Sequence, residues 1–331
     1  MAVAFEHIPV LGREVVEYLT FPEERPARLI DGTVGGGGHS ALLLAKYPRL
    51  ELLGIDRDDD ALAKAAETLA FAKERVRLVH GSYSEMARLA EEAGWDRIDG
   101  VLLDIGVSSP QFDRAERGFS WRTEGPLDMR MDRRSGLNAS RLLNTASERE
   151  LERILREYGE VAKSRRLAAA IVRHREAKPF ATTADLVDVC DEVLGRTRSG
   201  QLPAPTLVFQ ALRIAVNDEL GELERALPEA VKLLDKGGRI AVICFHSLED
   251  RIVKNFFRTE AASCVCPPGL PVCMCGKVAS LRVLTKKALS ARPDELESNR
   301  RSAPAKLRAA EKIIDIVEQN LPIETGTGEK Q

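Results

Sequence analysis

The residues best suited to chemistry gather around four consecutive glycines, 35–38, which follow Asp31 and precede His39. Consecutive glycines leave no side chain between the backbone and a ligand, and a helix that starts after them directs its N–H groups at an anionic group. Asp56 follows about 20 residues later, a spacing at which a carboxylate can accept hydrogen bonds from both hydroxyls of a ribose. This combination indicates a ligand that contains a nucleoside.

Two further polar residues follow apolar stretches in the same third of the chain. Tyr83 comes shortly after the stretch 76–80 and supplies an aromatic ring on which an adenine could stack. Asp104 ends the stretch 100–104 and leads into a segment rich in Gly and Ser. Together with the glycines, these residues describe a nucleoside-containing cofactor.

Strands and helices alternate where these residues lie, and this alternation predicts βαβ units with a parallel sheet. The expected strands are continuous apolar runs, as buried parallel strands are, and they end at the polar residues. Ligands of such sheets bind beyond the carboxyl ends of the strands. We expect strands at 28–31, 52–56, 76–80 and 100–104, and helices at 40–47, 60–73 and 86–93.

The alternation stops after the fourth strand and resumes late in the chain. Between about 112 and 217 we expect no strand, an irregular loop over 115–138, and four helices. The α/β pattern returns with a helix, the turn 236–238, a strand at 239–245 and a helix at 248–260. We therefore predict an α/β fold with a mostly parallel, Rossmann-like sheet and an inserted all-helical domain. The predicted cofactor-binding domain comprises 1–112 and 217–322, the inserted domain 113–216, and a disordered tail 323–331.

Composition narrows the class of protein. The chain has 331 residues, of which 44% are hydrophobic and 30% charged, enough to bury a sizeable core. No apolar run approaches the ~18 residues that a membrane helix needs, and the first residues lack the apolar stretch of a signal peptide. We therefore expect a cytoplasmic protein without a membrane partner. The net charge is −2, but basic residues dominate 130–175 and 277–308, which allows a nucleic-acid partner.

Two short patterns point to different cofactors. Gly36-x-Gly38-x-x-Ala41 fits a dinucleotide fingerprint, which is a weak signal inside a tetraglycine. Asp104 followed by Ser109-Pro110 is instead similar to the element of amino-methyltransferases in which an acidic or polar residue precedes prolines and an aromatic residue. A simple turn at 108–110 is the alternative to that second interpretation.

Longer motifs resemble one family, the bacterial small-subunit ribosomal RNA cytosine-N4 methyltransferases, which use S-adenosylmethionine. The resemblance spans roughly residues 6–310. Its motifs are His7-Ile8-Pro9-Val10-Leu11, Asp31-Gly32-Thr33 with Gly38-His39-Ser40, Ile55-Asp56-Arg57-Asp58, Leu102 to Gln111, Glu116 to Ser120, Gly125 to Asp132, Phe209 to Ile214 and Phe245 to Arg251.

The resemblance implies a class I methyltransferase-like fold with a helical insertion and a substrate cytosine near the decoding site of 16S ribosomal RNA. It implies no catalytic metal. The cofactor contacts that it implies are Gly37, Gly38, His39, Asp56, Tyr83, Asp104 and Gln111.

Asp104 and Ser109 are the expected catalytic residues. The cytosine amino group is a poor nucleophile because its lone pair is delocalised into the ring. An enzyme can accept hydrogen bonds from that amine and hold it in line with the sulfonium methyl, which can remove several kcal/mol from the barrier. Three aromatic residues, Phe112, Phe119 and Trp121, either receive the base or pack the insertion against the sheet. His246 is expected to orient a neighbouring loop.

Three other functions stay open on the sequence alone. A nicotinamide-dependent oxidoreductase would use the dinucleotide pattern. A non-catalytic RNA-binding ribosome-assembly factor would bind RNA without transferring a methyl group. A DNA cytosine-N4 or adenine-N6 methyltransferase would share the loose element at 109–112, although the long motifs disfavour it.

Two Cys-x-Cys pairs, 264/266 and 273/275, place four thiols within twelve residues. Four thiolates could hold Zn²⁺ tetrahedrally, but structural zinc sites more often use a Cys-x₂-Cys spacing. A disulfide is disfavoured in a reducing cytosol. The sequence therefore favours a Pro-rich loop with reduced thiols, while Cys190 and Cys244 lie in apolar contexts and are expected in the core.

Overall fold

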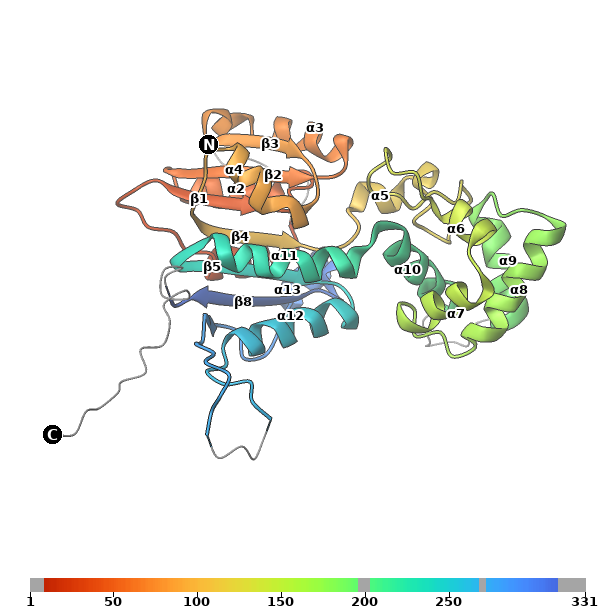
Figure 1. Cartoon of the computed structure of the whole chain (residues 1–331). Coiled ribbons are helices and arrows are strands. Elements are labelled where there is room, and N and C mark those ends of the chain that lie inside the picture. The colour runs from red at the N-terminus through yellow and green to blue at the C-terminus, as the bar shows by residue number, and fades with distance from the viewer. Residues whose placement is uncertain (1–8, 196–202, 268–271, 315–331) are drawn as a thin grey trace. The chain divides into compact units, whose positions relative to one another are not determined.

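The computed structural model describes residues 9–195, 203–267 and 272–314 (Figure 1). The expected disordered tail, 323–331, lies outside these residues. The chain divides into two compact units, one from 1–105 with 223–331 and one from 106–222. These limits lie a few residues from the domain boundaries predicted above. Among the described residues, no helix is long and apolar enough to cross a membrane.

The first unit is built on one sheet with the strand order β3-β2-β1-β4-β5-β8-β6, and β7 pairs with β8. Strands β1 to β5 are parallel neighbours, whereas β8 runs antiparallel to β5, β6 and β7. The strands are β1 Ala27–Asp31, β2 Leu50–Asp56, β3 Val76–His80, β4 Ile98–Asp104, β5 Leu234–Cys244, β6 Leu281–Val283, β7 Leu289–Ser290 and β8 Lys306–Lys312. This is the doubly wound α/β fold that the alternation predicts.

Helices cover both faces of this sheet because successive strand residues point to opposite sides. Ile30, Val101 and Val242 pack with α4, α11 and α12, while Leu29 and Leu102 pack on the other face with α1, α2 and α3. The helices of this layer are α1 Gly12–Tyr18, α2 Gly38–Lys46, α3 Asp59–Thr68, α4 Met86–Glu92, α11 Glu219–Leu233, α12 Ser247–Glu260 and α13 Pro293–Ser298.

Two local predictions for this unit are wrong, and one strand was not predicted. The helix expected over 60–73 ends at Thr68 and continues as a 3₁₀ segment, Ala70–Arg75, because Ala72 leaves helical backbone geometry. The turn expected at 236–238 lies inside β5, where Gly237 has φ +85° and the pairing with β4 shifts register. The antiparallel strand β8 was not expected at all.

The second unit is helical and has its own hydrophobic core. Its helices are α5 Ser109–Asp113, α6 Ala139–Thr145, α7 Glu148–Glu157, α8 Ser164–Ala177, α9 Thr183–Leu194 and α10 Ala204–Asn217. Ser147 caps α7 by accepting the N–H of Glu150. The irregular segment over 115–138 is tied to α10 because the Asn217 amide donates to the Met129 carbonyl and accepts the N–H of Met131.

Candidate active site

The loop after β1 is held by Asp31, which points back into the protein. Its carboxylate accepts the Ser40 hydroxyl at 2.6 Å and the Thr33 N–H at 3.2 Å. Burial raises the pKa of Asp31 to about 6, and the Ser40 hydrogen bond opposes that rise. Asp31 therefore fixes the two ends of the glycine loop to each other.

The glycine loop and Asp56 come together, as the spacing predicts. The N–H of Gly35 donates to Asp56 Oδ2 at 2.9 Å, and the N–H of Asp58 donates to Oδ1 at 2.9 Å. Gly35 and Gly37 have φ values of +51° and +82°, which a residue with a side chain adopts only with strain. Gly37 also precedes α2, so the loop leads directly into the N-terminus of that helix.

Tyr83 lies beside the same loop. A Cβ at Gly32 would stand 2.8 Å from Tyr83 Cβ and 2.6 Å from Leu103 Cδ2, so only glycine fits there. The Tyr83 side chain is buried, and the Arg57 guanidinium lies 5.7 Å from the centre of its ring. The Cβ of Tyr83, the aromatic residue predicted after β3, is thus packed closely against Gly32 of the loop that follows β1.

Asp104 stands at the carboxyl end of β4, next to both the loop and His39. Its N–H donates to Thr33 Oγ1 at 2.6 Å, and its Oδ2 lies 3.6 Å from His39 Nδ1. His39 Nε2 lies 2.7 Å from the Val10 carbonyl, and burial lowers the pKa of the imidazole. A neutral ring therefore donates from Nε2 and leaves Nδ1 as an acceptor.

The other carboxylate oxygen of Asp104 has no partner. Oδ1 is buried and makes no hydrogen bond within the described part of the chain. Burial raises the pKa of Asp104 to about 7, and the negative charge of Glu249 adds to the rise. An unsatisfied buried carboxylate is expensive in a folded protein and marks a candidate functional group.

Glu249 is a residue of this site that sequence reasoning missed. It is fully buried and accepts the N–H groups of Phe245 and His246 at 2.8 and 3.2 Å. The N–H of Glu249 in turn donates to His246 Nδ1 at 3.4 Å, which completes a capping box at the start of α12. His246 thus orients the neighbouring helix start, as expected. The spacing His-x-x-Glu carries the signal, but capping boxes usually begin with Ser or Thr.

Gln111 and Ser109 lie in the second unit, on the short helix α5. The N–H of Ser108 donates to Gln111 Oε1 at 3.1 Å, and the N–H of Gln111 donates to Ser108 Oγ at 3.4 Å. The Gln111 side chain therefore caps the helix of which Ser109 is the first residue. The predicted cofactor contact of Gln111 and catalytic role of Ser109 stay predictions.

The aromatic residues after β4 mostly pack within the second unit. Phe119 is buried in its core, and Trp121 packs against that core with Nε1 donating to Thr206 Oγ1 at 3.1 Å. Phe112 is 41% exposed. Phe119 and Trp121 therefore pack within the second unit itself, and packing against the sheet is not what their contacts show.

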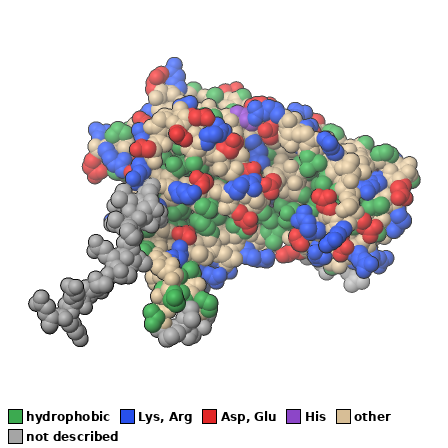
Figure 2. Space-filling model, viewed as in Figure 1, with side chains coloured by type: hydrophobic (Ala, Val, Ile, Leu, Met, Phe, Trp, Pro, Cys, Tyr) green, Lys and Arg blue, Asp and Glu red, His purple; other side chains and the backbone are tan. Residues whose placement is uncertain are grey.

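Basic side chains are exposed on the helices of the second unit. On the face seen in Figure 2, Lys and Arg side chains gather over this unit. Arg165 and Arg166 in the first turn of α8 are exposed, as is Arg149 in α7. Exposed positive charge of this kind suits contacts with phosphates.

Comparisons with known proteins agree with the motifs. A family model described as the MraW methylase family matches residues 4–313. A protein of Heliobacterium modesticaldum named "Ribosomal RNA small subunit methyltransferase H" is 50% identical over 316 residues, which cover 94% of this chain and 100% of the relative. A protein of Geotalea uraniireducens with the same name is 51% identical over 311 residues, covering 93% and 99%.

Solved structures are more distant. An rRNA methylase from Streptococcus thermophilus is 11% identical, with a TM-score of 0.40 and coverage of 92% of this chain and 94% of its own. That score is too low to support an inference, so the fold class rests on the strand order and on the relatives. Since the family model spans nearly the whole chain and relatives share half of its residues, this chain belongs to the MraW methylase family.

Proposed function

We propose that this chain transfers a methyl group from S-adenosylmethionine to the exocyclic N4 of one cytosine in 16S ribosomal RNA, near the decoding site. Membership of a methylase family and full-length relatives named as small-subunit RNA methyltransferases support the reaction class and the substrate class. The observation that carries the mechanism is the buried Asp104 carboxylate with an unpartnered Oδ1 at the end of β4.

The residues at the strand ends fit the cofactor. The glycine loop presents backbone at the start of α2, and the Asp56 carboxylate next to it is suited to ribose hydroxyls. Tyr83, whose Cβ packs close to Gly32, is proposed to border the adenine. When bound, S-adenosylmethionine supplies an electrophilic methyl group on a positively charged sulfur. The unpartnered Asp104 Oδ1 gives this side of the site the negative charge that such a sulfonium favours.

The Asp104 carboxylate is suited to bind the cytosine amino group and to accept a proton from it. Its ionised Oδ1 can accept a hydrogen bond from the cytosine amino group, which holds the nitrogen in place and raises its electron density. As the new N–C bond forms and the S–C bond breaks, the nitrogen must lose a proton. A carboxylate whose pKa is about 7 can accept that proton near neutral pH. Ser109, five positions later, is proposed to help position the base.

The proposed macromolecular partner is the RNA of the small ribosomal subunit, bound in part through the exposed arginines of α7 and α8. Because the proposed substrate is ribosomal RNA, the proposed place of action is the cytoplasm. Single-stranded RNA suits this chemistry, since its bases can be splayed out of the stack.

Labelled S-adenosylmethionine and small subunits that lack the modification test this function. The expected result is label in the subunit RNA with the wild-type chain and none with Asp104→Asn. Calorimetry against S-adenosylmethionine and NAD separates the alternatives, because an oxidoreductase would bind NAD instead. Binding of subunit RNA without any label would identify a non-catalytic assembly factor and overturn the proposal.

A further inference from the structure

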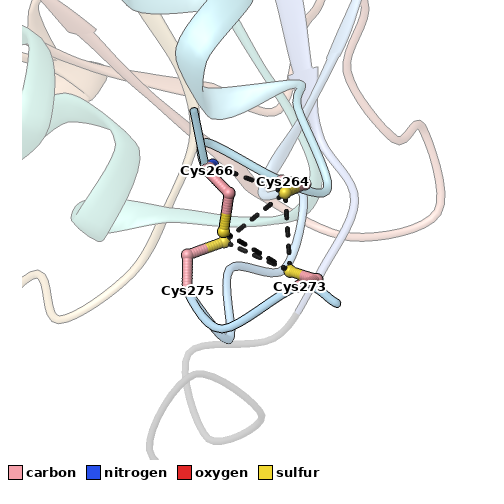
Figure 3. A group of neighbouring side chains, drawn as sticks. All are labelled: Cys264, Cys266, Cys273 and Cys275. Carbon is pink, nitrogen blue, oxygen red and sulfur yellow. Dashed lines mark hydrogen bonds between the residues drawn. The ribbon is translucent and has the colours of Figure 1, made fainter. Parts of the chain in front are cut away.

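Four cysteine side chains converge in the loop that joins α12 to β6. Cys264, Cys266, Cys273 and Cys275 point toward one another (Figure 3), and all four Sγ atoms lie within 4.8 Å of each other. The separations are 3.4 Å for 264–273, 3.5 Å for 273–275, 3.8 Å for 264–275 and 4.0 Å for 266–273. Neither the cofactor site nor the helical unit includes these residues.

These separations match a mononuclear metal centre better than disulfides. A disulfide brings two sulfurs to about 2.05 Å. Four thiolates at about 2.3 Å from a central Zn²⁺ in tetrahedral geometry stand about 3.8 Å from one another. The separations of 3.4 to 4.0 Å are centred close to that tetrahedral edge.

Backbone N–H groups around the cluster are arranged to donate to sulfur. The N–H of Val265 donates to Cys275 Sγ, that of Cys266 to Cys264 Sγ, and that of Met274 to Cys266 Sγ, each at 3.4 Å. Such donors disperse the negative charge of metal-bound thiolates and orient them. In the sequence, the Cys-x-Cys spacing disfavoured a zinc site. In the structure, the same spacing allows all four sulfur atoms to face one point.

The described residues of this loop bury little apolar surface of their own. Its base is closed by Lys277 and Ser280, both of which donate to the Glu260 side chain at the end of α12. Beyond that base the apolar side chains are exposed; Val272 is 70% exposed and Met274 85%. A segment that buries so little apolar surface needs another source of stability, and a structural metal is a common one.

We propose that Cys264, Cys266, Cys273 and Cys275 bind one Zn²⁺ in a closed, structural Cys₄ site that orders the loop between α12 and β6. Four protein ligands leave no open coordination position, so the ion takes no part in methyl transfer. The site is independent of the proposed function and would stand if the reaction were different.

Metal analysis of the full chain, purified without chelator and supplied with Zn²⁺, tests the site. The expected content is about one Zn²⁺ per chain, as a closed Cys₄ site requires. The double variant Cys264→Ser/Cys273→Ser should lose at least nine-tenths of it. Cys190→Ala, which removes a thiol buried in the helical core, should retain the full amount.

A second measurement on the wild-type chain avoids any effect of substitution on folding. Replacement of the ion by Co²⁺ should give the intense near-ultraviolet absorption of thiolate-to-cobalt charge transfer, and a chelator should abolish it while amide exchange over the described part of 261–280 speeds up. A zinc-saturated preparation that holds no stoichiometric metal, or a chain with two disulfides among these cysteines, overturns the proposal. So does amide exchange that is the same with and without chelator.

Discussion

Asp104 is the residue on which most of the chemistry depends, and its environment works against its charge. The carboxylate is buried, faces the negative Glu249 and leaves Oδ1 without a hydrogen bond in the described structure. Each of these features favours the protonated form, which is why the pKa lies near 7. The protein therefore keeps a basic, partly desolvated oxygen where the amine is proposed to lie.

Asp104→Asn should abolish methyl transfer and stabilise the fold at high pH. Burial raises the pKa of the Asp104 carboxyl from its usual 3.8 to about 7 in the folded state, so the wild-type chain loses stability as pH rises through this range. The amide carries no charge, so at pH 8 the variant should be more stable by on the order of 2 kcal/mol, after a discount for partial exposure. At pH 4 that difference should vanish. Urea unfolding at both pH values measures it.

Asp96→Asn is the matched control for that substitution. The Asp96 side chain is 90% exposed and makes only a 3.7 Å ion pair with Arg28, so methyl transfer and stability should both stay close to wild type. An Asp104→Asn chain that keeps its rate within about tenfold, or under ~1.4 kcal/mol of barrier, would remove Asp104 from the mechanism.

Glu249→Gln should shift the pH–rate profile without breaking the helix cap. The amide oxygen can still accept the N–H groups of Phe245 and His246, while the negative charge that raises the pKa of Asp104 is gone. The acid limb of the profile should therefore move to lower pH. Single-turnover rates between pH 5 and 9 measure the limb, and an unmoved limb in a folded variant would contradict this coupling.

At the scale of elements, the glycine loop and the strands around it show which parts of the fold can be predicted from the sequence. The apolar runs of the sequence predicted the strands β1 to β4 and their order along the chain. The residues that follow these strands were predicted to form one cofactor site: Gly37, Gly38, His39, Asp56, Tyr83 and Asp104. The structure places Asp56 against the loop and His39 beside Asp104. Their contacts with a cofactor stay predictions.

Other elements could not be predicted because their local pattern disagrees with their environment. Strand β8, Lys306–Lys312, has charged residues at both ends and in its interior, which is unusual for a strand inside a sheet. Leu307 and Ala309 nevertheless pack in the core. Arg308 pairs with Asp250 of α12 at 2.7 Å. That partner lies far away in the sequence. The role of Glu249 could not be predicted for the same reason, since this residue of α12 acts on Asp104 at the end of β4, far away in the sequence.

Two glycine substitutions in the loop should differ sharply. Gly32→Ala places a Cβ 2.6 Å from Leu103 Cδ2 and 2.8 Å from Tyr83 Cβ, so it should destabilise the protein by about 1–3 kcal/mol. At Gly36 the nearest atom to an added Cβ is Lys64 Cγ at 3.5 Å, so Gly36→Ala should stay within about 0.5 kcal/mol. Denaturant midpoints compare them, and equal midpoints would refute the close packing at Gly32.

At the scale of the whole molecule, we propose that the two units serve two tasks, cofactor binding and RNA binding. The first unit holds the strand ends and their acidic residues, and the second has its own core and an exposed basic surface. Of the two basic segments, 130–175 belongs to the second unit, whereas 277–308 belongs to the first. Cofactor binding and RNA binding should therefore respond to different substitutions.

Charge reversal tests that separation. Arg165→Glu/Arg166→Glu should weaken binding to small-subunit RNA by about tenfold or more and lower the salt dependence by about one to two counterions, while affinity for S-adenosylmethionine stays unchanged. Lys64→Glu/Lys73→Glu, at exposed positions of the first unit, is the matched control. An equal loss of RNA affinity in the control would show that the basic helices are not the RNA surface.

The position of the transferred methyl group tests the central claim most directly. Small subunits that lack the modification are incubated with the wild-type chain and isotope-labelled S-adenosylmethionine, and the RNA is digested to nucleosides for mass spectrometry. We predict that the label appears as N4-methylcytidine at a single site, and that Asp104→Asn yields none. Label on a ring carbon, on another base, or undiminished in the Asp104→Asn reaction would contradict the account.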